Sequence, residues 1–142
     1  MKKLFASCVL LAVGFTAALL TIDDSRQTQA AAVKAKPPMI AHSVYLSLKE
    51  NSSASKQKLV AACKEYLGGH DGTIFFATGE RDEDAKGGFT DTDYDVALII
   101  AFQDKASLKK YAKSSRHLQF IGKYGTLFSK VRVFDATFDR IE

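Results

Sequence analysis

The chain has 142 residues, a formal net charge of +4 and a hydrophobic content of 46%. So small a positive excess, on scattered lysines without interleaved aromatic side chains, is typical of solvated helix faces, and we expect no nucleic acid partner. Of the two cysteines, only Cys63 lies beyond the first ten residues. The main part of the chain therefore cannot form an internal disulfide, and its length suits a single domain.

The first 32 residues have the plan of a secretory signal. Lys2 and Lys3 form a positive n-region, residues 4–22 carry no charge, and the alanines at 30–32 offer a cleavage site. We therefore predict a signal peptide at 1–32, a tether at 33–38 and an extracytoplasmic protein, either periplasmic or secreted. Because the uncharged run of 19 residues is just long enough to span a bilayer, a membrane anchor at residues 4–22 is the alternative.

Two elements are predicted next. Residues 40–48 alternate between apolar and small or polar side chains, which indicates a first strand with His42 on its apolar face. The polar cluster at 51–55 is suited to cap a helix that Gly68-Gly69 would end. We expect Lys56, Lys58, Lys64 and Glu65 to face water. The apolar stripe of this helix consists of Leu59, Val60, Cys63, Tyr66 and Leu67.

The second half of the chain carries the strongest pattern. Residues 73–79 predict a strand, and the polar stretch 81–93 predicts a long connection to a central strand at 94–103. Asp104 stands where a helix N-cap is expected. A bend at Ser114-Ser115 would bring Tyr111 and His117 to one pocket, although six residues separate them. A last strand is predicted at 130–138.

The order strand, helix, strand, strand, helix, strand predicts an α+β fold of the ferredoxin-like kind, with an antiparallel sheet whose helices cover one face. Since soluble monomers seldom expose a large apolar patch, the open sheet face is expected to pair with a second copy in a homodimer. The strands that suggest this are apolar on both sides. They place Ala97, Ile99 and Ala101 opposite Val96, Leu98 and Ile100, and Ile74 and Phe76 opposite Phe75 and Ala77.

Three stretches, IAHSVYLSLK, DVALIIAFQDKASLKKYAKSSRHLQF and KVRVFDATF, resemble the stress-responsive A/B barrel family, the dimeric α+β barrel domains called Dabb. The resemblance covers nearly all of residues 39–138. The family pattern has a histidine in the first strand, matched by His42, and a tyrosine followed by a His-Pro-x-His segment. Tyr111 and the final histidine, His117, are present, whereas Ser114 and Ser115 replace the first histidine and the proline.

The resemblance implies a site. In polyketide cyclases of this family the tyrosine and the last histidine act as acid and base, so catalytic roles would fall on Tyr111 and His117. An imidazole can remove a proton next to a carbonyl, and a phenol can donate to the developing enolate. A ligand would contact His42, Tyr111 and His117. The structural alternative is that both histidines are buried and hydrogen-bonded within the protein.

Two functions stay open at this point, and whether the protein is an enzyme is undecided. The favoured hypothesis is an exported stress-response-type homodimer that binds a small apolar molecule between sheet and helices. The alternative is a cofactor-free enzyme, polyketide-cyclase-like or monooxygenase-like, that uses Tyr111 and His117. The second is favoured if His42, Tyr111 and His117 converge within hydrogen-bond reach on an open cavity, and disfavoured if they point apart or if Phe and Leu side chains fill the cavity.

Other chemistry finds little support in the sequence. His70-Asp71 beside the acidic run at 82–84 suggests a divalent cation, but the glycines around His70 are more typical of a helix stop and turn. We expect no metal and no cofactor. A membrane is expected as a partner only if the N-terminal segment stays uncleaved.

Overall fold

The computed structural model describes residues 38–139, so the predicted signal peptide and nearly all of the predicted tether lie outside the described residues. The elements are β1 (Met39–Leu48), α1 (Ser53–Leu67), β2 (Thr73–Glu80), β3 (Val96–Phe102), α2 (Lys105–Ala112), α3 (Ser115–Tyr124), the 3-10 turn η2 (Gly125–Leu127) and β4 (Phe128–Phe138). The four strands form one antiparallel sheet in the order β2-β3-β1-β4. This is the predicted ferredoxin-like α+β fold.

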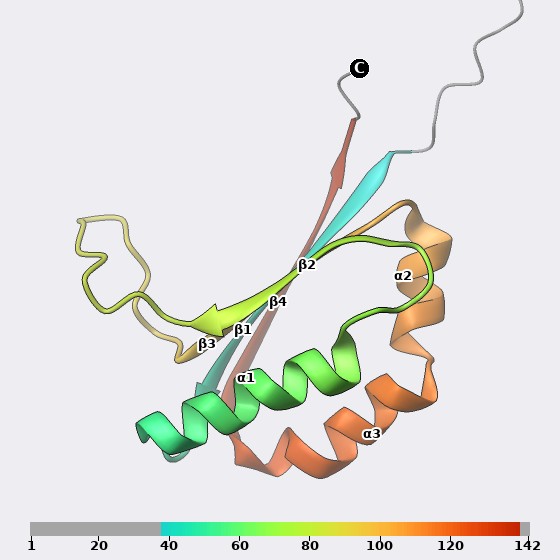
Figure 1. The fold of residues 1–142 in the computed structure, drawn as a ribbon. Helices are drawn as coiled ribbons and strands as arrows, with labels where there is room; N and C mark the ends of the chain where they lie inside the picture. The colour runs from blue at the N-terminus through green and yellow to red at the C-terminus, as the bar shows by residue number, and fades with distance from the viewer. Residues whose placement is uncertain (1–37, 140–142) are drawn as a thin grey trace, which may run out of the picture. The chain divides into compact units, whose positions relative to one another are not determined.

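All three helices cover the same face of the sheet (Figure 1). The central strand β3 alternates between fully buried and half-buried residues along its whole length, as its period-2 pattern predicted. Ile100 and Phe102 are completely inaccessible. A fully buried side chain of this size contributes about 1.5–3 kcal/mol, so β3 carries a large share of the core.

Two side-chain caps define where α2 and α3 begin, and the second cap separates the two helices. Asp104 begins α2 as predicted, because its Oδ1 accepts hydrogen bonds from the backbone N of Ser107 at 2.7 Å and from its hydroxyl at 2.8 Å. Ser114 has an extended backbone, and its Oγ accepts from the backbone N of His117 at 3.3 Å. Ser114 thereby starts a new helix, which confirms the predicted bend.

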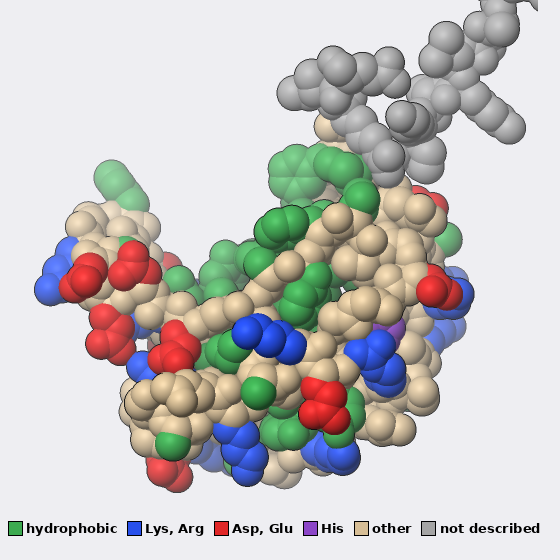
Figure 2. All heavy atoms as spheres, viewed as in Figure 1, with side chains coloured by type: hydrophobic (Ala, Val, Ile, Leu, Met, Phe, Trp, Pro, Cys, Tyr) green, Lys and Arg blue, Asp and Glu red, His purple; other side chains and the backbone are tan. Residues whose placement is uncertain are grey.

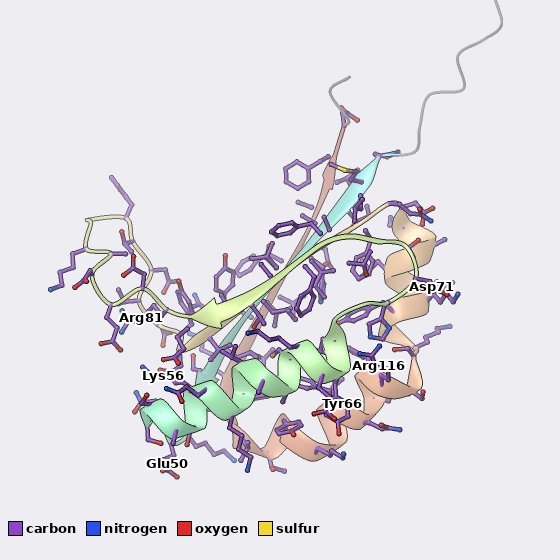
Figure 3. The ribbon with its side chains drawn as sticks, in the orientation of Figure 1. Glu50, Lys56, Tyr66, Asp71, Arg81 and Arg116 are labelled. Carbon is purple, nitrogen blue, oxygen red and sulfur yellow. The ribbon has the colours of Figure 1, made fainter. Side chains whose placement is uncertain are left out.

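Lys58, Lys64 and Glu65 of α1 are exposed as predicted, but the prediction for Lys56 was wrong. Lys56 on α1 was expected to face water, but only 15% of its side chain is exposed. Its Nζ lies 3.0 Å from Glu83 and 3.6 Å from Glu80. Glu80 is the last residue of β2, and Glu83 lies in the connection that follows it, so the end of β2 runs beside the first turns of α1, where Figure 3 shows Arg81 near Lys56. Local sequence pattern does not reveal this contact.

The face of β2 was also predicted incompletely. Ile74 was expected to share a face with the partly buried Phe76, yet it is 50% exposed. The register of β2 against β3 shifts between Thr73 and Phe75, and this irregularity displaces Ile74 from the alternation.

No helix of residues 38–139 covers the opposite face of the sheet (Figure 1), and hydrophobic side chains gather on it (Figure 2). Phe75, Phe134 and Phe138 are each about half exposed on the strands. The segment 81–95 borders this face and is tied to β4 by the ion pair of Asp91 with Arg132. No helix within residues 38–139 is long and apolar enough to cross a membrane.

Candidate functional site

A cavity of about 440 Å³ lies between the helices and the sheet. Its polar side chains are His42 on β1, Tyr111 on α2 and His117 on α3. The structure therefore brings together all three residues that the sequence predicted as ligand contacts. The rest of the lining is mainly apolar and includes Val44, Leu46, Leu98, Phe120, Ile121, Val131 and Val133.

Tyr111 is the centre of the polar cluster. Its ring centroid lies 5.8 Å from that of His42, 4.7 Å from that of His117 and 4.9 Å from that of His70, so all three histidines of the chain contact it. Burial, together with the nearby thiol of Cys63, raises the pKa of Tyr111 well above its usual value. The phenol is thus a neutral hydrogen-bond donor at any physiological pH.

His117 is held neutral in the same cluster. Burial lowers its pKa, and the positive charges that His42 and His70 can carry lower it further, while the backbone carbonyl of Ala112 opposes the shift. Its Nδ1 is buried and makes no hydrogen bond of normal geometry with any residue from 38 to 139. The other ring nitrogen, Nε2, is accessible and makes no hydrogen bond with residues 38–139. We therefore expect a ligand in the cavity to meet Nε2.

His42 has a carboxylate partner that sequence reasoning missed. His42 stands directly opposite Asp135 in the antiparallel pair of β1 with β4, so their side chains share one face. His42 Nδ1 donates to Asp135 Oδ1 at 2.7 Å. This bond fixes the tautomer, and in the neutral ring it leaves Nε2 as a hydrogen-bond acceptor. Only the register of two strands distant in sequence brings Asp135 to this site.

His70 lies on the far side of Tyr111 and does not line the cavity. Gly69, with φ of +67°, turns the chain after α1 so that His70 Nε2 reaches the backbone carbonyl of Tyr66 at 2.9 Å. Asp71 pairs with Lys110 at 2.7 Å. The part of the chain that the structure describes contains no cluster of three metal-ligating side chains.

Arg116 positions α3, and with it His117, against α1. Its guanidinium donates to the backbone carbonyls of Glu65 and, at 2.8 Å, of Gly68 (Figure 3). These carbonyls belong to the last turn of α1, where a cation also meets the negative end of the helix dipole. Local sequence pattern does not predict this contact, because it joins residues about 50 positions apart.

Cys63 is a packing residue, as its predicted place on the apolar stripe of α1 indicated. Its side chain is completely inaccessible, and burial raises the pKa of its thiol to about 11. Such a thiol is neither a nucleophile nor a metal ligand at neutral pH.

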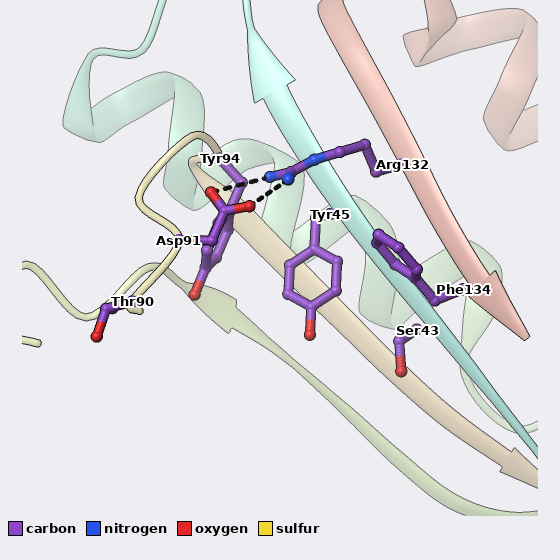
Figure 4. Close-up of a pocket in the computed structure, with 7 residues that line it drawn as sticks. All are labelled: Ser43, Tyr45, Thr90, Asp91, Tyr94, Arg132 and Phe134. Atoms are coloured by element: carbon purple, nitrogen blue, oxygen red, sulfur yellow. Dashed lines mark hydrogen bonds and ion pairs between the residues drawn. The ribbon is translucent and has the colours of Figure 1, made fainter. Parts of the chain in front are cut away.

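A second hollow of about 490 Å³ lies on the open sheet face (Figure 4). Tyr45, Tyr94 and Phe134 line it, and the Asp91–Arg132 ion pair closes one side. Although it is slightly larger than the cavity under the helices, it holds no histidine and its carboxylate is already paired. The cavity around Tyr111 is therefore the better candidate for binding chemistry.

These features define a class: a ferredoxin-like α+β domain in which the described helices cover one sheet face and a ligand-sized cavity lies beneath them. The model of the stress responsive A/B barrel domain, Dabb, matches residues 40–138, and the chain belongs to this family. No curated protein matches the chain significantly.

Solved structures share the fold. A Dabb family protein from Mesorhizobium loti has 22% identity and a TM-score of 0.58, covering 70% of this chain and 95% of its own. A dimeric ferredoxin-like protein of unknown function from Thermobifida fusca has 11% identity and a TM-score of 0.60, covering 75% and 96%. Hydroxynitrile lyase from Passiflora edulis has 16% identity and a TM-score of 0.59, covering 75% and 98%. At such identities the similarity shows the fold alone.

Proposed function

We propose that this protein is an exported homodimer that binds a small apolar molecule in the cavity between the sheet and the helices. The observation that carries the proposal is the polar cluster of His42, Tyr111 and His117 within an otherwise apolar lining. A cavity with a few converging polar groups is the usual form of a small-molecule site, because the apolar walls supply affinity and the polar groups fix orientation.

The cluster also limits the ligand's chemistry. His117 is neutral and Tyr111 is a neutral donor, so the cavity offers no unpaired positive charge for an anionic ligand. His42 is already engaged with Asp135. The ligand we propose therefore has an apolar body and one uncharged oxygen function, a hydroxyl or carbonyl, that meets Tyr111 and the Nε2 of His117.

Dimerisation through the open sheet face is the second part of the proposal. Phe75, Phe134 and Phe138 are half exposed there, and burying about 500 Å² of such surface would contribute on the order of 12 kcal/mol before the costs of association. Similar folds from Thermobifida fusca, Bacteroides fragilis and a Jannaschia species are described as dimeric. The extracytoplasmic location rests on the sequence of residues 1–32 alone.

A second candidate is a cofactor-free enzyme that uses the same cluster. Tyr111 and His117 are in ring contact, and His42 carries a carboxylate partner of the kind that orients a catalytic imidazole. In this proposal Nε2 of His117 removes a proton next to a substrate carbonyl, and the Tyr111 hydroxyl donates a hydrogen bond to the enolate oxygen. The Passiflora edulis lyase is an enzyme with this fold, which favours keeping the candidate.

Native mass spectrometry of the purified protein tests both parts in one measurement. The proposal predicts a dimer whose mass exceeds that of two chains by a retained small molecule, which denaturation releases. The denatured mass also reports where the mature chain begins. A monomer without added mass, which also fails to take up apolar probes, would contradict the proposal.

A further inference from the structure

The cavity reaches the surface along an apolar rim, formed by Leu118 and Ile121 on α3 and by Val131 and Val133 on β4. These four side chains are between 49% and 56% exposed. Ile121, Val131 and Val133 also line the cavity, and Leu118 lies one helical turn from Ile121. The same side chains therefore belong partly to the cavity wall and partly to the molecular surface.

An uninterrupted basic stretch surrounds this rim in the sequence. Residues 105–134 contain eight lysines and arginines and no aspartate or glutamate. Five of the eight bind partners within the domain, through ion pairs or through hydrogen bonds to Tyr66 and to backbone carbonyls. The other three, Lys105, Lys109 and Lys113, make no ion pair or hydrogen bond with any residue between 38 and 139.

Lys113, the C-cap of α2, directly follows a residue that lines the cavity, and Lys109 and Lys105 lie about one and two turns before it. They recur every four residues, so they share one side of α2 and its C-cap. Ala112, between Lys109 and Lys113, is exposed and lines the cavity. Of the neighbouring carboxylates, Asp135 is bonded to His42, and Asp104, next to Lys105, accepts from the backbone N of Ser107. Unpaired positive charge thus stands next to exposed apolar side chains, which is the combination that interfacial membrane-binding surfaces use.

We propose that the apolar rim docks on a bilayer that carries anionic lipid, and that the ligand of the cavity passes between bilayer and protein there. Leu118 and Ile121 enter the headgroup boundary while the three lysines meet lipid phosphates. This inference rests on the proposed function, because it assigns the source of the apolar ligand. A second copy covering the rim is disfavoured, since a two-fold contact would bring the lysines of both copies together.

The chain contains no tryptophan, so Leu118→Trp introduces a single fluorophore at the rim of the full-length protein. The control is Phe89→Trp, at a fully exposed position in the segment between β2 and β3. We expect a blue shift of Leu118→Trp emission with vesicles of phosphatidylcholine containing phosphatidylglycerol, quenching by brominated lipid, and neither effect with Phe89→Trp. Because the fluorophore reports its own surroundings, membrane binding by residues 4–22 does not mimic this result.

The lysines give the second arm. Replacing Lys105, Lys109 and Lys113 by glutamine in the Leu118→Trp protein should weaken partitioning about fivefold for each charge removed. Three results would each overturn the inference. The first is an emission that vesicles do not change, and the second is a shift that is equal for neutral vesicles and insensitive to the lysines. The third is a shift that depends on protein concentration in the absence of vesicles. The last result would identify a second copy as the occupant. Ligand uptake is measured separately, without vesicles. If the protein takes up no ligand in that measurement, the proposed function is contradicted, whatever the vesicle experiments show.

Discussion

Replacing His117 with leucine should stabilise the ligand-free protein while weakening the binding of a ligand that carries a polar oxygen. The buried Nδ1 of His117 makes no normal hydrogen bond with the described residues, and a buried polar atom in that state costs about 1–3 kcal/mol. Because the side chain is partly accessible and the Ala112 carbonyl is near, we take the lower end, about 1 kcal/mol. Leucine has a similar size and no polar atom to desolvate.

His70 provides the matched control. It contacts the same tyrosine ring, at 4.9 Å between centroids, but its Nε2 bonds the Tyr66 carbonyl at 2.9 Å. His70→Leu should therefore lower the free energy of unfolding by about 1 kcal/mol. In a domain of this size a change of 1 kcal/mol corresponds to a Tm shift of roughly 4–8 °C, upward for His117→Leu and downward for His70→Leu.

The assay is thermal and urea unfolding of both variants without ligand, followed by titration with an apolar fluorescent probe. His117→Leu should unfold at a higher temperature than wild type. It should bind derivatives of the probe that carry a polar group more weakly, whereas His70→Leu should bind them with wild-type affinity. If His117→Leu loses as much stability as His70→Leu and keeps full binding, His117 is a structural histidine and its assignment to the site is wrong.

The remaining predictions concern the interface, the helix contact and pH. Ile99→Lys, on the open sheet face, should give monomer or aggregate in sedimentation, and a stable dimer would refute that interface. Arg116→Ala should cost about 1.5 kcal/mol of unfolding free energy through lost bonds to α1, against almost nothing for the unpaired Lys113→Ala. Because folding lowers the pKa of His117, the unfolded chain binds this proton more readily, and wild type loses stability as the pH falls below about 6.5. Unfolding of wild type should therefore be more acid-sensitive than that of His117→Leu.

The sequence predicted the fold because its signals are local. Alternation in β3, the Asp104 cap and the serine at 114 each act within a few residues, and each is present in the structure. The convergence of Tyr111 and His117 followed from the predicted bend. Agreement between local pattern and final fold is what a sequence with one stable structure is expected to show.

What the sequence missed depends on contacts between distant segments. Asp135 reaches His42 only through the register of β1 with β4, and Arg116 reaches α1 only through helix packing. His70 looked like a turn residue, and its contact with Tyr111 requires the docked α2. A single sequence carries no signal for such pairs, because neither partner has an unusual neighbourhood of its own.

The measurement that tests the account most directly fills the cavity without disturbing the fold. Gly125 lines the cavity, has an ordinary helical backbone, and an added Cβ would meet only Ile121 at 3.8 Å. Gly122 lies outside the cavity, and a Cβ there meets nothing within 4 Å. Titration of an apolar fluorescent probe should show binding to wild type and Gly122→Phe, and little or none to Gly125→Phe. Equal binding by all three proteins would show that the ligand site is elsewhere.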